Sequence, residues 1–156
     1  MFIVYKPEYN PSNLTGTVGG NISSYPLSGY LDELFYHVDA PASGTPTSSI
    51  QYRKVFVKNT YSSTSTYTRV WIEAIEHEDQ IYIANCTGLV DSTTSPITPP
   101  SGVSGWVTPS DYTEGLNIGT LTPNSYTGFW IQQYLSGITS PDPYATFRLR
   151  IGGIVA

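Results

Sequence analysis

Alternation of apolar and polar residues predicts β-strands in the middle of the chain. The clearest pattern spans Ile50–Asn59, where Val55 and Val57 fall on one face. Tyr52, Phe56 and the aliphatic stem of the neighbouring lysine fall on the other face. Side chains on a strand point alternately to its two faces, so this segment is expected to pack on both sides.

The same alternation recurs after this segment. Tyr67–Ile75 and Gln80–Asn85 follow, separated by short polar turns, and together with Ile50–Asn59 they suggest a three-stranded meander. Further strands are expected at Asn117–Leu121, Tyr126–Tyr134 and Tyr144–Val155. Seven to eight strands with mostly short connections predict an all-β fold, an antiparallel β-sandwich of the jelly-roll or Ig-like kind.

The first third of the chain gives a weaker pattern. Met1–Tyr5 suggests a short edge strand or an extended arm, and Lys6–Tyr30, rich in Pro and Gly, suggests irregular structure. Residues 1–20 are therefore expected to form an extended N-terminal arm, and residues 21–156 a single domain. Leu31–Val38 carries a short helix-like apolar pattern. A long polar connection at about 88–115 is of a length that is usually functional or disordered.

Composition excludes several classes of protein. The 156 residues include 12% charged and 13% aromatic residues, and the net charge is −5. Disordered chains are charge-rich and poor in aromatics, and helical bundles need more helix formers. The acidic balance disfavours nucleic acid, and no apolar run is long enough for a membrane helix. The N-terminus does not resemble a signal peptide.

The residues that commonly carry chemistry give little signal. His37 and His77 lie outside any metal-binding motif, and Cys86 is expected to be a buried, inert thiol. The acidic cluster Glu73–Asp79 could surround Ca²⁺, but a solvated turn is the favoured interpretation. No nucleophile or phosphate-loop motif occurs, so neither an enzyme nor a cofactor or metal is expected.

Aromatic and basic residues suggest two kinds of binding surface. Trp71, Trp106 and Trp130 could line a sugar-binding face, although half-buried sheet positions or a protein interface are favoured. Arg148 and Arg150 share one face of the last strand, as Lys54 and Lys58 do on an earlier one. These cations could meet an acidic partner or pair internally across strands.

Several motifs, taken together, resemble a known group of proteins. They are Gly19–Ser23 (GGNIS), Leu34-Phe35, Tyr52–Thr60 (YRKVFVKNT), Leu116–Pro123 (LNIGTLTP), Gly128–Ile131 (GFWI) and Thr146–Ile151 (TFRLRI). This order is similar to that in small β-sandwich structural proteins of tailed bacteriophage virions. The resemblance covers most of the chain, and Tyr52–Asn59 is its most distinctive part. The chain departs from the group at Gln132–Tyr134, where an Arg-rich continuation is expected.

The resemblance implies a non-enzymatic virion component, with no contact to nucleic acid or membrane. A capsid decoration (cement) protein is favoured, a homotrimer on the outer capsid surface that bridges neighbouring major capsid protein subunits. A neck, tail or baseplate component is the alternative, and a carbohydrate-binding module on a tail fibre is an alternative of another class. The residues expected to bind partners are Met1, Phe2, Ile3, Tyr5, Tyr9, Trp106, Arg148 and Arg150.

Overall fold

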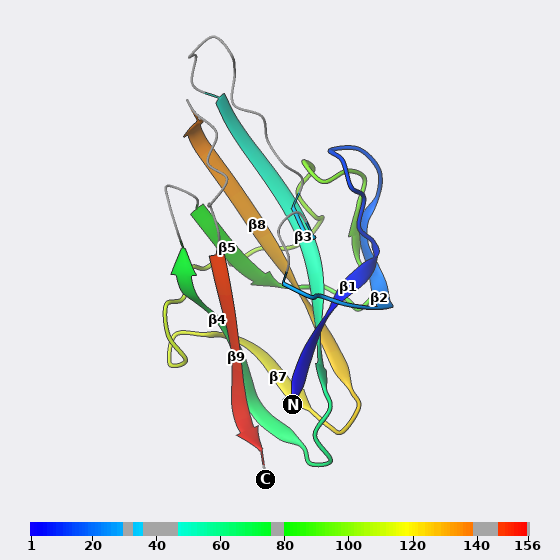
Figure 1. The fold of residues 1–156 in the computed structure, drawn as a ribbon, viewed down its shortest axis with the longest axis vertical. Helices are drawn as coiled ribbons and strands as arrows, with labels where there is room; N and C mark the ends of the chain where they lie inside the picture. The colour runs from blue at the N-terminus through cyan, green and yellow to red at the C-terminus, as the bar shows by residue number, and fades with distance from the viewer. Residues whose placement is uncertain (30–32, 36–46, 76–79, 139–146, 156) are drawn as a thin grey trace.

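A computed structural model describes residues 1–29, 33–35, 47–75, 80–138 and 147–155. These residues form nine strands, all paired antiparallel, in two sheets (Figure 1). The strands are β1 (Phe2–Tyr9), β2 (Val18–Pro26), β3 (Thr47–Asn59), β4 (Ser65–Ile75), β5 (Gln80–Asn85), β6 (Ser92–Thr93), β7 (Leu116–Leu121), β8 (Tyr126–Ile138) and β9 (Phe147–Val155). The expected all-β sandwich is confirmed, with one or two more strands than the pattern predicted.

The larger sheet has six strands in the order β5-β8-β3-β1-β2-β6. Its centre is the long antiparallel pair β3 and β8, which keeps one register from Ser49 opposite Leu135 to Lys58 opposite Tyr126 and shifts between Thr47 and Ser49. The predicted faces of β3 are confirmed. Val55 and Val57 belong to the main core, whereas Tyr52 packs in a separate cluster on the opposite face.

The smaller sheet has three strands in the order β7-β4-β9 and packs against the inner face of the larger sheet. Apolar residues of both sheets form one continuous core between the two layers. Its buried members are Val55, Val57, Val70, Ile72, Ile81, Ile83, Ile118, Leu121, Phe129 and Ile131. Burial of this apolar surface is the main stabilising term for a two-layer fold.

The long connection after β5 is an ordered layer over the outer face of the larger sheet. Val103 and Trp106 from this connection pack on a second buried cluster of Val18, Tyr52 and Trp130. Backbone hydrogen bonds pin it to both sheets. In the larger sheet, the Tyr52 amide donates to the Pro96 carbonyl at 2.7 Å, and the backbones of Ile83 and Val107 exchange two hydrogen bonds of 2.8 and 2.9 Å. In the smaller sheet, the Ile72 amide donates to the Pro109 carbonyl at 2.8 Å.

The predicted meander is wrong. β3 pairs with β1 and β8, β4 lies in the other sheet, and β5 pairs with β8. Alternation identifies a strand and its faces, but the partner of a strand depends on segments far away in the sequence. Strands that follow one another here cross between the two layers, as in other sandwiches.

The N-terminal predictions also need correction. β1 lies between β2 and β3, so Met1–Tyr5 belongs to neither an edge strand nor a free arm. Lys6–Tyr30 is not irregular throughout, because β2 spans Val18–Pro26. Gly19 and Gly20 fit this strand because their φ angles of 98° and 79° suit only glycine. Most of the helix-like segment Leu31–Val38 lies outside the described residues.

Candidate interaction surface

A buried lysine anchors the long connection to the larger sheet. The Lys54 side chain is fully buried on the outer face of β3, and its ammonium pairs with the Asp91 carboxylate. The same ammonium donates to the carbonyl oxygens of Gly20, Gly88 and Leu89 at 3.0–3.2 Å. These oxygens replace water around the buried charge, so Lys54 is a structural cation and not a surface one.

Asp91 is held from its other side as well. Its Oδ2 accepts the Trp130 indole N–H at 3.0 Å and the Thr87 amide at 2.9 Å. Burial raises the pKa of Asp91, but the hydrogen bonds from Lys54, Trp130 and Thr87 outweigh it and lower the pKa below its ordinary value. This carboxylate is therefore ionised and engaged at neutral pH.

Arg53 has a comparable structural role on the inner face of β3. Its Nε donates to the Leu34 carbonyl at 2.6 Å, and its guanidinium carbon lies 5.7 Å from the centre of the Phe35 ring. Burial lowers the pKa of Arg53 to about 10, which leaves the group charged at neutral pH. Arg53 thus ties residues 33–35 to the sheet.

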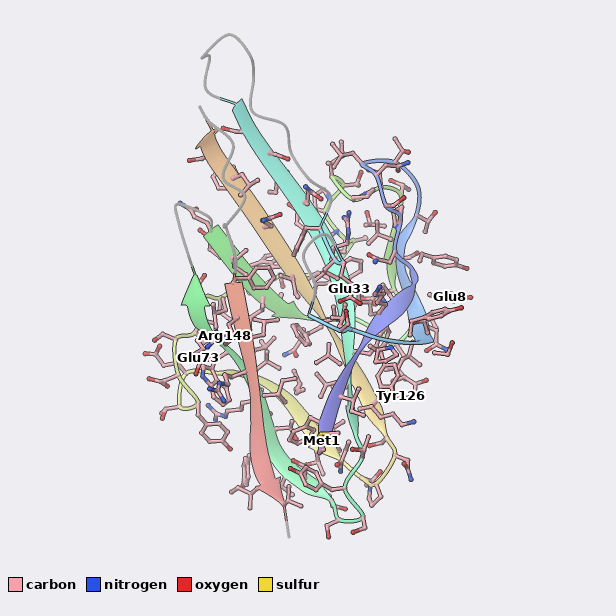
Figure 2. The ribbon with its side chains drawn as sticks, in the orientation of Figure 1. Met1, Glu8, Glu33, Glu73, Tyr126 and Arg148 are labelled. Carbon is pink, nitrogen blue, oxygen red and sulfur yellow. The ribbon has the colours of Figure 1, made fainter. Side chains whose placement is uncertain are left out.

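The arginines of β9 pair within the chain. Arg148 Nη1 lies 3.3 Å from Glu73 Oε2, and Arg150 Nη2 lies 2.7 Å from Glu73 Oε1 across the β4–β9 pair (Figure 2). The hydrogen bond from Arg150 lowers the pKa of Glu73 despite some burial. Internal pairing, one of the two interpretations of these cations, is therefore observed for Arg148 and Arg150.

The three tryptophans do not form one sugar-binding face. Trp130 is fully buried, Trp106 packs against Tyr52 with ring centres 5.7 Å apart, and Trp71 packs edge-on against Tyr112 at 5.8 Å. Trp71 lies in the smaller sheet, whereas the other two lie on the outer face of the larger one. Trp71 is a half-buried sheet position, and Trp106 is a half-buried residue of the long connection.

One end of the sandwich exposes several apolar side chains. We call it the uncharged end for its lack of charged side chains, although the α-ammonium group of Met1 lies there. We define it by Met1, Tyr61, Tyr67, Ile154 and Val155. Met1 is 63% exposed, Tyr67 62% and Ile154 56%. Contiguous exposed apolar groups of this kind mark interaction sites more often than isolated ones do.

Contacts between distant segments bring these residues to the same end. The Thr60 amide donates to the Met1 carbonyl at 2.8 Å, and the rings of Phe2 and Tyr61 meet edge-on at 5.7 Å. Thr66 on β4 lies opposite Ile154 on β9. Figure 1 shows both termini and the β3–β4 turn gathered at this end.

No charged side chain belongs to the segments that build this end. Residues 1–5, 60–68, 115–127 and 151–156 contain apolar, aromatic, hydroxyl and amide side chains, with Gly and Pro. Lys58, opposite Ile3 in the β1–β3 pair, borders the end. Neutral groups lose less hydration energy than ions when a partner covers them, and interface cores are depleted of Lys, Glu and Asp.

The eight residues expected to bind partners do not form one site. Met1, Phe2 and Ile3 lie at or beside the uncharged end, although Phe2 packs partly into the core. Tyr5 and Tyr9 lie further along β1, and Trp106, Arg148 and Arg150 lie elsewhere. The sequence analysis missed Tyr61, Tyr67, Ile154 and Val155. The signal that could have found them is the absence of charge from residues 60–68 and 151–156.

Other candidate chemistry is limited in the part of the chain that the structure describes. Cys86 is half-buried, and burial raises the pKa of its thiol, in line with an inert group. No cluster of His, Cys, Asp or Glu suited to a metal, and no helix able to cross a membrane, is found among the described residues. His37, His77 and residues 76–79 of the acidic turn lie outside them.

Comparisons with protein-family models, curated proteins and solved structures found no match for this chain.

Proposed function

We propose that this protein is a non-enzymatic structural component of a bacteriophage virion, and specifically a capsid decoration (cement) protein on the outer capsid surface. The observation that carries the proposal is the uncharged end, where exposed apolar side chains from three segments, residues 1–5, 60–68 and 151–155, lie beside both termini. The motif order shared with virion β-sandwich proteins supports the same assignment.

The partner we propose is the major capsid protein in its assembled lattice. A surface without charged side chains binds mainly by burial of apolar area and by shape, and its Ser, Thr and Tyr hydroxyls supply hydrogen bonds at the rim. A decoration protein that bridges neighbouring capsid subunits stabilises the shell by mass action, because the lattice alone presents the complete binding site. Closed symmetric oligomers are common, and a homotrimer at capsomer junctions fits this arrangement.

The alternatives within a virion are a neck, tail or baseplate position, which would use the same surface on another partner. The net charge of −5 argues against contact with the packaged genome, because nucleic acid attracts basic surfaces. A place on the outside of the particle is therefore favoured over an internal one.

The test is binding of purified protein to capsids that lack it. We expect saturable binding at a symmetry-related copy number, and at least about tenfold weaker binding for Ile154→Asp, a loss of about 1.4 kcal/mol. Val90→Asp is the matched control, because Val90 is 68% exposed on the long connection, away from this end. Both variants should melt close to the wild type, since both side chains are exposed.

Three results would overturn the proposal. Binding to tail complexes but not to shells would assign the protein to the tail. Equal loss of binding in both variants would show that the uncharged end is not the contact. Absence of binding to any part of the particle would exclude a virion role.

A further inference from the structure

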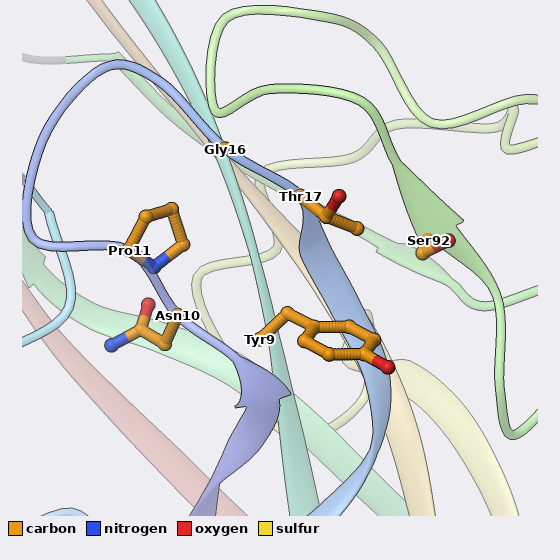
Figure 3. A pocket seen from close by; sticks show the side chains of 6 residues that line it. All are labelled: Tyr9, Asn10, Pro11, Gly16, Thr17 and Ser92. Atoms are coloured by element: carbon orange, nitrogen blue, oxygen red, sulfur yellow. The ribbon is translucent and has the colours of Figure 1, made fainter.

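A hollow on the outside of the larger sheet is a candidate ligand site. It lies beside the loop between β1 and β2, has a volume of about 690 Å³, and is lined by Tyr9, Asn10, Pro11, Gly16, Thr17 and Ser92 (Figure 3). The hollow is wide open to solvent and most of its lining residues are exposed, so it would cover a ligand on one side only. Nothing in the proposed virion role requires this hollow, so its function is a separate question.

An aromatic ring forms part of the lining. The Tyr9 ring lies directly over Gly20, since a Cβ added at Gly20 would come within 2.7 Å of it. The glycine thus lets the ring lie close to the sheet. Tyr9 nevertheless remains 46% exposed, which leaves ring surface open to a ligand.

Polar groups of the lining have no partners in the part of the chain that the structure describes. The hydroxyls of Tyr9, Thr17 and Ser92 make no hydrogen bond there. Asn10 donates through Nδ2 to the Glu33 carbonyl at 3.2 Å, but its buried Oδ1 accepts no hydrogen bond. Because that oxygen is buried out of the reach of solvent, only the exposed side chains of Tyr9, Thr17 and Ser92 offer hydroxyls to a ligand.

The charge of the surroundings narrows the ligand class. None of the six lining side chains is charged, and the Glu8 carboxylate, like the Tyr9 ring, lies beside Gly20. An anionic ligand would meet this carboxylate, and no described cation in the lining would compensate it. A neutral ligand with an apolar face for the ring and hydroxyls for the free polar groups fits best.

We propose that this hollow binds a neutral pyranose sugar, free or at the end of a glycan. The C–H face of the sugar ring packs on Tyr9. Sugar hydroxyls hydrogen-bond with the exposed hydroxyls of Thr17 and Ser92. The site differs from a sugar-binding face built on the tryptophans, none of which lines it.

The hollow also lies away from the uncharged end. Met1 and Tyr9 are at opposite ends of β1, and Figure 1 places the β1–β2 loop far from both termini. A ligand here would stay accessible while the uncharged end contacts another protein. The two proposals are tested separately, because sugar binding is measured on free protein without capsids.

The experiment is a two-dimensional amide NMR titration of the intact protein with methyl glucoside, methyl galactoside and N-acetylglucosamine. We expect at least one of them to shift amides at residues 9–17 and 92. Tyr9→Ala should weaken that binding by about tenfold, because it removes the stacking surface. Tyr25→Ala is the matched control, since Tyr25 is 69% exposed on β2 and does not line the hollow.

A second variant and two further ligands keep the result decisive if Tyr9→Ala perturbs folding. Ser92→Ala alters an exposed side chain, so it should keep the wild-type melt and still weaken binding about threefold, the effect of losing one modest hydrogen bond. Sorbitol, which has hydroxyls but no ring, and glucuronate should cause much smaller shifts. The proposal fails if no pyranose shifts these amides, if sorbitol acts as strongly, or if binding is unchanged in both Tyr9→Ala and Ser92→Ala.

Discussion

At the scale of single residues, several charged groups hold the described part of the fold together. Lys54 is the clearest case, because its ammonium is buried yet surrounded by the Asp91 carboxylate and three carbonyl oxygens. The sequence placed its stem on the correct face of β3. It could not reveal the partner, which lies 37 residues away in a connection without regular alternation.

Removal of the negative charge at this pair should be strongly destabilising. Asp91→Asn leaves the Lys54 ammonium buried without a counter-ion, and breaking such pairs costs about 3–5 kcal/mol. We expect about 3 kcal/mol, because the carbonyl oxygens remain as acceptors. The measurement is urea unfolding at neutral pH. Asp111→Asn, an exposed site that keeps its acceptor for the Glu114 amide, should change the free energy of unfolding by less than about 0.5 kcal/mol. A similar loss in both variants would contradict this account.

Glu33 gives a prediction for acid pH. Burial raises its pKa, but hydrogen bonds from Lys6, Ser28 and the Gly29 amide outweigh this and lower it to about 2, against an ordinary value of 4.5. A carboxyl whose pKa falls on folding stabilises the protein above its unfolded pKa, and this stability is lost as pH falls through the folded pKa. The contribution is therefore complete near neutral pH and declines between about pH 5 and pH 2.

Comparison with Glu33→Gln isolates this contribution. Near neutral pH the variant should be less stable than the wild type by about 1 kcal/mol, a value reduced for solvent screening of a pair at the surface. The difference should shrink as the pH approaches about 3. Urea unfolding of both proteins across this range is the measurement, and a difference independent of pH would show that the carboxylate charge is irrelevant.

At the scale of elements, strand positions could be predicted well but their partners could not. Alternation of apolar and polar residues predicts β3, β4, β5 and β8, because each of these strands buries at least one face. β2 was missed because its glycines and proline have low strand propensity. The structure shows why glycine is needed there. A Cβ at Gly19 would lie 2.6 Å from the Asp91 carbonyl oxygen and 3.0 Å from the Trp130 ring.

Gly19→Ala should therefore be costly. Its φ of 98° strains any residue with a Cβ, and the added methyl would also push the 91–92 backbone away from β2. We expect a loss of about 3 kcal/mol in thermal or urea unfolding, of which roughly 1–2 kcal/mol is backbone strain. Gly119→Ala is the control, because its φ of 94° is similar and no atom lies within 4 Å of the added Cβ. An equal loss in both would mean that backbone strain alone matters.

At the scale of the whole molecule, surfaces form from segments that the sequence keeps apart. The uncharged end joins residues from both termini with the β3–β4 turn, and the hollow joins the β1–β2 loop with β6. Met1 and Tyr9 were nominated from the sequence as members of an arm. The residues that lie beside them in space could not be predicted, because residues 9 and 92, for example, meet only after β2 and β6 pair. Fold class was therefore within reach of the pattern, whereas the composition of each surface was not.

The position of the termini has a practical consequence for anyone who wishes to label or display this protein. A tag or fusion partner joined at either terminus would emerge beside Tyr61 and Ile154 and shield that surface. Such a fusion could fold normally and still lose the particle binding that we propose. The exposed tip at Ser101-Gly102, on the ordered connection, is the better insertion point. Cargo inserted there would project from a different part of the domain and leave both termini unencumbered.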